Sequence, residues 1–247
     1  METEKRRISW IDELRGVALL AMILHHITFN LTDFLHLPLP WLRAALASRA
    51  FSLVQTVFIA IFFGISGICC RFSHRPFLRA GRVLLGAAAV TAVTWGLFPS
   101  QTIWFGVLHC LAVCMGLYAV LRRWIRKIPP IWGMAAALLL FVITYRVPDG
   151  FLLTLPLPAE WYRGGFLTIF GFSGPFFTTL DYVPLLPHLF LFLAGVFIGR
   201  LPLPVSRTRS RFLAFFGRHS LAVYLLHQPV LFGAFFCLEK ILEGMKK

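Results

Sequence analysis

Seven long apolar stretches follow one another along the chain, separated by short polar or basic segments. Each is close to the roughly 17–25 residues that a helix needs to cross the hydrocarbon core of a bilayer. The predicted spans cover residues 13–35, 51–70, 79–98, 103–121, 130–147, 185–200 and 213–238. The sixth is short as an apolar run, and the seventh is long enough to begin with an interfacial turn before Gly217. We therefore predict an all-α integral membrane protein, a bundle of about seven transmembrane helices that forms one domain over residues 1–247.

The amino-acid composition excludes an ordinary soluble domain. Hydrophobic residues make up 58% of the chain and charged residues 14%, whereas soluble domains are about 45–50% apolar and about a quarter charged. The N-terminus resembles a secretory signal, but its long apolar run lacks an obvious small-residue cleavage site, which favours an uncleaved anchor. Two connections are expected to be folded: residues 41–46 as a short surface helix, and residues 146–184 as a loop rich in Pro, Gly and aromatic residues.

The net charge of +14 follows the predicted topology. Lys and Arg gather before the first span, between the second and third, after the fourth, and between the sixth and seventh. These segments lie on the same side of the membrane, so the positive-inside rule places the N-terminus in the cytoplasm and the C-terminus outside. The basic character therefore argues for a lipid bilayer as partner and against nucleic acid. The cytoplasmic arginines also suit anionic lipid head groups or a phosphorylated cofactor.

A polar stripe runs along the first predicted span. Arg15 and His26 are eleven residues apart, which is three helical turns plus roughly 20°, so their side chains share one face about 16 Å apart along the axis. Asp12 and Asn30 lie one turn beyond them on this face. Polar side chains within lipid are costly and usually serve a function. The structural alternative for Arg15 is a positive-inside anchor paired with Asp12.

Five of the eight histidines fall inside predicted spans: His25, His26, His109, His188 and His227. Any one of them can be a structural imidazole satisfied by a single hydrogen bond. Five together, with Asp181 and Asn30 within reach, favour a functional site. His26 lies near mid-membrane on the face of Arg15, whereas His25 points about 100° away and is expected to face a neighbouring helix or lipid.

The five cysteines also fall inside predicted spans, so we expect no disulfide framework in the outer loops. Cys110 and Cys114, one turn apart beside His109, form only a weak metal-binding pattern. We interpret them as small apolar packing residues and predict no metal.

Five sequence blocks resemble one known family. They are residues 7–18 (RISWIDELRGVA) with 22–26 (MILHH), 62–73 (FFGISGICCRFS), 105–109 (FGVLH), 181–187 (DYVPLLP), and 217–221 (GRHSL) with 224–230 (YLLHQPV). These blocks resemble bacterial membrane proteins related to the catalytic domain of heparan-α-glucosaminide N-acetyltransferase. The wider group of transmembrane acyltransferases shares an arginine and a histidine separated by ten residues on the first helix, as Arg15 and His26 are here.

The resemblance implies a membrane-bound acyltransferase, a multi-pass protein of the bacterial inner membrane. Such an enzyme moves an acyl group, expected to be acetyl, from cytosolic acyl-CoA to a hydroxyl or amine of a sugar-type acceptor on the outer side. Acetyl-CoA is then the co-substrate, and His26 acts as general base or as a nucleophile that forms an acyl-imidazole. The implied site consists of His26, Asp181 and His109 for catalysis, Arg15, Arg71, Arg218 and His227 for the donor, and Asn30 and His188 for the acceptor.

The chain departs from the family pattern at two of these positions. The family often has aspartate in place of Asn30 and commonly tryptophan in place of His188. Without a carboxylate at position 30, either Asp181 or Asn30 by a hydrogen bond orients His26, or no residue does. The catalytic histidine of the animal enzyme lies near the outer end of its first span, and His36 is the nearest match to it by position.

Two other functions fit the sequence. A small proton-coupled transporter also lines its bundle with His and Asp, although the paired broken halves typical of transporters are not evident. A non-catalytic polytopic partner protein is the third option, and it predicts no CoA binding. The acceptor, the choice between N- and O-acylation, and the oligomeric state, including a homo-oligomer, stay open at this point.

Overall fold

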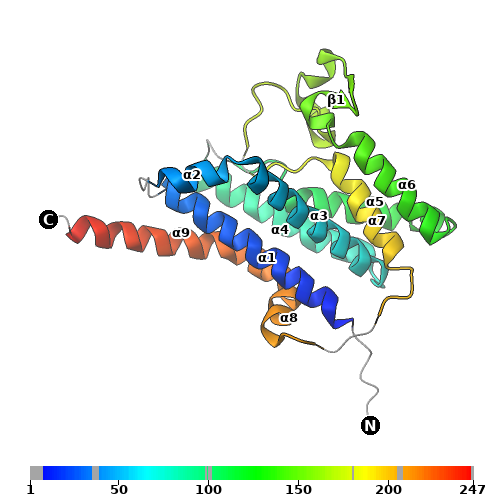
Figure 1. Ribbon diagram of the computed structural model, residues 1–247, viewed down its shortest axis with the longest axis horizontal. Coiled ribbons are helices and arrows are strands. Elements are labelled where there is room, and N and C mark those ends of the chain that lie inside the picture. The colour runs from blue at the N-terminus through cyan, green and yellow to red at the C-terminus, as the bar shows by residue number, and fades with distance from the viewer. Residues whose placement is uncertain are drawn as a thin grey trace, which may run out of the picture. The chain divides into compact units, whose positions relative to one another are not determined.

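The computed structural model describes residues 8–34, 39–97, 99, 102–179, 181–204 and 208–245. Over these residues the chain is built almost entirely of helices (Figure 1). The helices are α1 (Ser9–Phe29), α2 (Pro40–Leu46), α3 (Arg49–Arg71), α4 (Pro76–Leu97), α5 (Val107–Ile125), α6 (Pro130–Thr144), α7 (Leu185–Ile198), α8 (Arg211–Arg218) and α9 (Ser220–Met245). The short strands β1 (Phe151–Leu152) and β2 (Leu155–Pro156) pair antiparallel.

Six helices in the described part of the chain are long and apolar enough to cross a membrane. They are α1, α3, α4, α5, α6 and α9, and the spans of α1 and α6 run on through Thr32 and Asp149. The predicted sixth span is α7, a shorter apolar helix of 14 residues. These helices confirm the prediction of an all-α membrane protein. The sidedness of the two termini stays a prediction.

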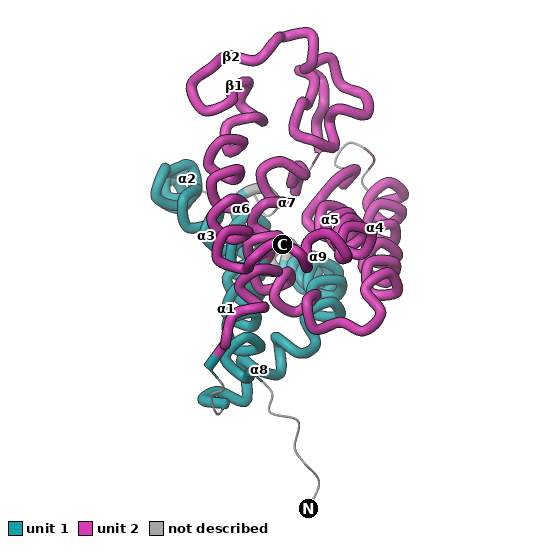
Figure 2. Tube along the Cα trace, turned by 90° about the vertical axis from the view of Figure 1, so that its right-hand side faces the viewer, with its two compact units in different colours: residues 1–62, 204–247 teal, residues 63–203 magenta. Residues whose placement is uncertain are grey.

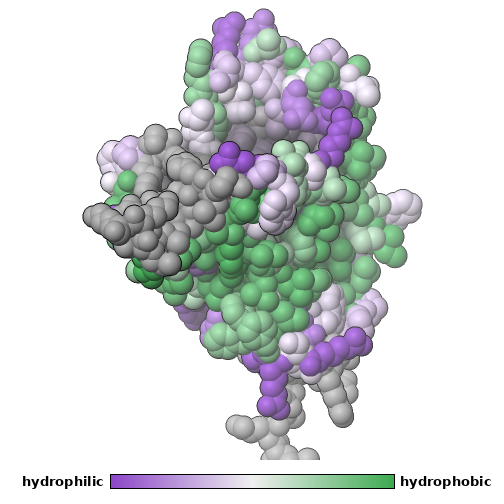
Figure 3. All heavy atoms as spheres, turned by 60° about the vertical axis from the view of Figure 1, so that its left-hand side comes forward, coloured by the Kyte–Doolittle hydropathy of each residue, from purple (hydrophilic) through white to green (hydrophobic). Residues whose placement is uncertain are grey.

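Large apolar side chains cover much of the surface, as Figure 3 shows for one face. Leu24, Leu85 and Trp132 are 62%, 73% and 74% exposed. Exposure of this kind is unfavourable in water, whereas lipid tails are as apolar as these side chains. A helix bonds most of its backbone polar groups internally, as a hydrocarbon environment requires.

By its internal contacts the chain divides into two compact units (Figure 2). The first comprises residues 1–62 and 204–247, which contribute α1, α2, the first part of α3, α8 and α9. The second comprises residues 63–203, with the end of α3 and the helices α4 to α7. The single domain over residues 1–247 stays a prediction.

In the first unit, α1 and α8 lie against each other at very close range. A Cβ atom on Gly16 would overlap the carbonyl oxygen of Leu213, and one on Gly217 would overlap the carbonyl oxygen of Asp12. Small residues permit this approach of two backbones, as they do at other close helix pairs in membranes. Arg15 joins the same two helices, because its Nη1 donates to the carbonyl oxygen of Gly217 at 3.1 Å.

The predicted interfacial turn before Gly217 is a separate helix, α8. Ser210 caps its start, with its hydroxyl oxygen accepting from the backbone N–H of Leu213 at 3.3 Å. Glu13 of α1 accepts from the backbone N–H groups of Arg209 and Ser210 at 2.5 and 3.0 Å. These bonds satisfy donors that the start of a helix leaves open, and they hold the start of α8 against α1.

In the second unit, α7 packs closely against α3. A Cβ atom on Gly67 would overlap the carbonyl oxygen of Phe192, and one on Gly195 would overlap that of Gly64. Gly67 of the sequence block at 62–73 and Gly195 of α7 therefore serve helix packing, whereas a Cβ atom on Gly64 would meet nothing within 4 Å.

Both connections that were expected to be folded have secondary structure. The first contains α2, over Pro40–Leu46, which confirms the short helix expected at residues 41–46. The second contains β1, β2 and three 3-10 turns, over Val147–Asp149, Ala159–Tyr162 and Gly165–Phe170. Its tyrosine hydroxyls bond to its own backbone, Tyr162 to Val147 and Tyr182 to Thr168.

Candidate functional site

The winding of α1 changes shortly after His26. Asn30–Phe34 form a π-helical turn. The hydroxyl groups of Thr28 and Thr32 donate to backbone carbonyls of the preceding turn at 2.7 and 3.0 Å. Single π-helical turns within α-helices are frequent at functional sites. The backbone next to the predicted catalytic histidine therefore differs from that of a plain helix.

His26 points from α1 toward α9. Its Nδ1 lies 2.8 Å from the side-chain amide nitrogen of Gln228, and its ring centroid is 5.0 Å from that of His227. Two adjacent residues of α9 thus hold one imidazole of α1, although 202 positions separate His26 and Gln228 in the sequence.

A bond to the backbone of its own helix fixes His227. Nδ1 of His227 donates to the carbonyl oxygen of Tyr224 at 2.6 Å. Pro229 lies inside the same helix and has no N–H, so the carbonyl of Leu225, four residues before it, loses its helical partner. His227 is 8% exposed, and its Nε2 is buried with no hydrogen-bond partner among the described residues. The ring therefore presents an acceptor nitrogen inside the protein.

The Gln228 amide determines which nitrogen of His26 carries the proton. With the amide nitrogen toward Nδ1, Nδ1 accepts a hydrogen bond. With the amide oxygen toward Nδ1, Nδ1 donates and Nε2 has a free lone pair. The oxygen and the nitrogen of the amide are nearly equal in size, so both orientations occupy the same space. In the first of them, Oε1 of Gln228 is buried with no partner among the described residues.

The other members of the polar stripe are also buried or bonded. Nη1 of Arg15 lies 3.8 Å from Oδ1 of Asp12, in addition to its bond to α8. Asn30 is 1% exposed, and its Nδ2 has no partner in the described part of the chain. His25 packs against Phe51 of α3, with ring centroids 5.4 Å apart, as expected of a residue that faces a neighbouring helix. The donor role of Arg15 and the acceptor role of Asn30 stay predictions.

In the second unit, both ring nitrogens of His109 have partners. The Thr91 hydroxyl donates to the carbonyl oxygen of Ile103 at 2.7 Å and lies 3.1 Å from Nε2 of His109, so Nε2 donates to this hydroxyl. Nδ1 of His109 accepts from the backbone N–H of Gly106 at 3.3 Å. His109 therefore caps the start of α5 and joins it to α4. Its catalytic role stays a prediction, and that role requires these bonds to open.

Two further predicted site residues lie before or at the start of α7. Nδ1 of His188 donates to the carbonyl oxygen of Pro184 at 2.8 Å, and its ring packs against Phe63 with centroids 5.2 Å apart. Asp181 has a φ of +55° and lies beside Gly106, where a Cβ atom would be 3.1 Å from Oδ2 of Asp181. The roles predicted for Asp181 and His188 stay predictions.

Tyr182, the residue after Asp181, is held by its hydroxyl bond to Thr168. Burial raises the pKa of the Tyr182 phenol, so the hydroxyl stays protonated and acts as a donor at neutral pH. It fixes the connection that leads into α7.

The predicted donor anchors differ in their surroundings. Arg71 ends α3, and its Nε is buried with no partner among the residues that the structure describes. Arg218 is exposed, and its Nε donates to the carbonyl oxygen of Ala214 at 3.1 Å. A guanidinium group with an open donor suits phosphate oxygens, and Arg71 has this property. His36 lies outside the described residues.

Sequence reasoning missed Gln228 as a partner of His26 and considered Asp181 or Asn30 as the orienting group, which stays a prediction. In the structure, Nδ1 of His26 is bonded to Gln228. The available signal was the run of two polar residues followed by Pro229 inside an otherwise apolar span. A proline inside a helix removes one backbone hydrogen bond, and here it directly follows His227 and Gln228.

Comparison with known proteins gives one match. The family model described as "Heparan-alpha-glucosaminide N-acetyltransferase, catalytic" matches residues 7–229. No curated protein and no solved structure matches the chain. The matched range includes His26, His227 and Gln228.

Proposed function

The chain belongs to the heparan-alpha-glucosaminide N-acetyltransferase catalytic family, and on this premise we propose that it transfers acetyl groups from cytosolic acetyl-CoA. The acceptor is a hydroxyl or amine of a sugar-type molecule on the outer side of a bacterial inner membrane. The protein is an integral membrane protein of an acetyltransferase family. We propose the N-terminus in the cytoplasm and the C-terminus outside, in agreement with the positive-inside rule.

The observation that supports this proposal most strongly is the oriented imidazole of His26. It lies within a membrane-spanning helix, bonded at Nδ1 to Gln228 and packed against the ring of His227. Polar groups are placed inside a membrane at a cost, and they usually mark a reaction or a transport path. A histidine whose tautomer is set by a hydrogen bond at one nitrogen is prepared for chemistry at the other.

Two routes use the same groups. In the direct route, Nε2 of His26 removes the proton from the acceptor O–H or N–H as that atom attacks the thioester carbonyl carbon. The C–S bond then breaks, and the CoA thiolate takes up the proton from His26. In the two-step route, Nε2 attacks the carbonyl carbon, the C–S bond breaks and CoA leaves as the thiolate. The acceptor then attacks the acetyl-imidazole, the bond from Nε2 to the acetyl group breaks, and the proton of the acceptor passes to the thiolate. Both routes need a lone pair on Nε2 and a proton on Nδ1. They therefore need the Gln228 amide turned so that its oxygen accepts from Nδ1, in place of the nitrogen that lies 2.8 Å from Nδ1 in the structure.

We assign the phosphates of the donor to Arg71, because the buried Nε of this residue has no partner among the described residues. Arg15 and Arg218 stay candidate anchors for the donor, and each also donates to a backbone carbonyl of α8. For the acceptor, we propose Asn30 as a hydrogen-bond donor, since its buried amide nitrogen also has no partner in the described part of the chain.

Membrane vesicles of opposite orientation test this function. Inside-out vesicles that contain the protein should transfer radiolabelled acetyl groups from external acetyl-CoA to an acceptor panel of amino sugars and sugar alcohols enclosed in the vesicle lumen. Right-side-out vesicles and vesicles without the protein should not, because acetyl-CoA does not cross the membrane. Transfer by right-side-out vesicles alone would reverse the topology. Solute uptake without any need for acetyl-CoA would identify a transporter and contradict the proposal.

Gln228 is a positioning residue, and its variants separate orientation from binding. Gln228→Leu should lower kcat about 10–100-fold, because a hydrogen bond to a group that becomes charged contributes about 1.5–3 kcal/mol. Gln228→Glu keeps an acceptor for the Nδ1 proton and should retain more activity than Gln228→Leu. KM for acetyl-CoA should not change in either variant. A raised KM with unchanged kcat would show that Gln228 binds substrate and does not orient His26.

A further inference from the structure

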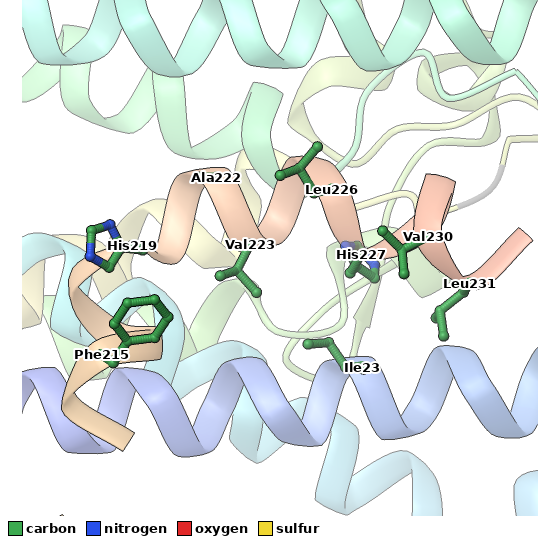
Figure 4. Close-up of a pocket in the computed structure, with 9 residues that line it drawn as sticks. All are labelled: Ile23, Phe215, His219, Ala222, Val223, Leu226, His227, Val230 and Leu231. Carbon is green, nitrogen blue, oxygen red and sulfur yellow. The ribbon is translucent and has the colours of Figure 1, made fainter. Parts of the chain in front are cut away.

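A groove of about 470 Å³ runs along α9 within the first unit (Figure 4). This volume is in the range of sites for small ligands. Its apolar walls are formed by Ile23 of α1, Phe215 of α8, and Val223, Leu226, Val230 and Leu231 of α9. Two histidines complete the lining: His219, at the junction of α8 and α9, and His227.

The position of the groove within a membrane-spanning helix restricts what can occupy it. From residue 219 to residue 231 it extends about 18 Å along the helix axis, within a helix that is long and apolar enough to cross a membrane. Leu226 and Val230 at its rim are 60% and 64% exposed. At this position along a membrane-spanning helix there is no water to bond polar groups, so an occupant must satisfy its own polar groups or have none.

The groove has a basic end and an apolar end. His219 stacks on Phe215, with ring centroids 4.7 Å apart, and follows the exposed Arg218 directly in the chain. Arg218 also lies three residues after Phe215 on α8, and side chains three residues apart are neighbours on a helix surface. Beyond His227 the lining is apolar through Leu231. An amphiphile with an anionic head group matches this arrangement, since basic pockets between membrane helices bind such head groups.

The chemistry of the walls favours a hydrocarbon chain over the arm of a CoA thioester. That arm carries two amide groups, which are costly to bury without hydrogen bonds. The groove has only histidines as polar side chains. Nδ1 of His227 is already used by Tyr224, so this side chain offers a single acceptor, its buried Nε2, to the two amide groups. An acyl chain has no polar group that requires a hydrogen bond.

We propose that this groove binds one acyl chain of an anionic membrane lipid, with the lipid phosphate at Arg218 and His219. The chain lies against Val223, Leu226 and Val230 and covers one side of His227. The ring of His227 in turn packs on His26, so the bound lipid supports the wall behind the candidate site. Lipid binding itself needs no acetyl transfer, so this proposal stands apart from the proposed function.

Lipid affinity of the purified, delipidated protein tests the proposal. Native mass spectrometry in detergent measures binding of phosphatidylglycerol and of phosphatidylcholine with the same acyl chains. Phosphatidylglycerol should bind more tightly. Arg218→Gln should weaken it about fivefold, the loss expected for one cation near a lipid head group. Arg211→Gln, at the other end of α8, is the matched control and should have less effect.

A bulky side chain placed in the groove should lower the affinity for phosphatidylglycerol and for phosphatidylcholine. Val223→Trp should lower phosphatidylglycerol affinity at least about tenfold, because several methylene groups lose their contacts. Leu226→Trp, at the exposed rim, serves the same purpose if Val223→Trp does not fold. Leu238→Trp, on α9 beyond the groove, is the control and should bind lipid as the wild type does.

Three results would overturn the proposal. One is equal binding of phosphatidylglycerol and phosphatidylcholine, which would indicate a general lipid contact. Another is unchanged lipid binding in folded Leu226→Trp, which would place the lipid elsewhere. The third is displacement of phosphatidylglycerol by acetyl-CoA or by inorganic phosphate, which would assign the basic end to the donor or to a free anion.

Discussion

His26→Ala is expected to lower acetyl transfer by about 10²–10⁴-fold, the usual contribution of a general base. If the enzyme follows the two-step route, the loss of activity should lie at the upper end of this range, because the variant has no nucleophile at this position. The change removes an imidazole that is bonded to Gln228 and leaves the apolar contacts of α1 in place. Acetyl transfer by the purified variant in proteoliposomes, with acetyl-CoA and acceptor both varied, measures the effect on kcat and KM.

His74→Ala is the control for this variant. His74 is an exposed histidine in the turn between α3 and α4, and its replacement should leave transfer unchanged. Thermal stabilisation by acetyl-CoA should be the same in His26→Ala as in the wild type, since binding depends on other residues. If stabilisation and transfer were lost together, His26 would be a binding residue and the mechanism proposed for it would be wrong.

Gly217→Ala should destabilise the protein by about 3 kcal/mol or more, at the upper end of the range for overpacking. The added Cβ atom would overlap the carbonyl oxygen of Asp12 in α1. The Cβ atom is attached to the backbone of α8 and the carbonyl group belongs to the backbone of α1, so neither can rotate away. The two helices must therefore move apart as a whole. The bond between Arg15 and Gly217 is then lost as well. The melting temperature and the monodisperse yield in detergent report the loss.

Gly233→Ala is the matched control, because a Cβ atom on Gly233 meets nothing within 4 Å. It lies inside α9, where alanine is favoured over glycine by about 1 kcal/mol in helices. The variant should be as stable as the wild type or slightly more stable. Equal melting temperatures for Gly217→Ala and the wild type would show that α1 and α8 are not in contact as described.

The helices were predictable because lipid acts as a uniform apolar solvent. Each span must be apolar over its full length and bond its own backbone, so α1, α3, α4, α5, α6 and α9 are visible as long runs in the sequence. The exception, α7, covers only 14 residues. The break between α8 and α9 also left a signal, a basic and amphipathic run up to His219.

The candidate site was predictable only in part. The spacing of Arg15 and His26 indicated a shared face of α1, because this face depends on helix geometry alone. The pairing of His26 with Gln228 depends on how α1 packs against α9, and sequence periodicity carries no information about it. For the same reason the cap that His109 forms with Thr91 and Gly106 was not foreseen.

Single-turnover transfer tests the central claim most directly, that the imidazole of His26 performs the acetyl transfer. Wild-type protein and His26→Ala, each in excess over radiolabelled acetyl-CoA and saturated with the same acceptor, are compared for release of free CoA and for labelled product. We predict that the wild type releases CoA and forms product within one turnover, whereas His26→Ala binds acetyl-CoA equally well and forms product at least about a hundredfold more slowly. Product formation by His26→Ala at the wild-type rate would contradict the account.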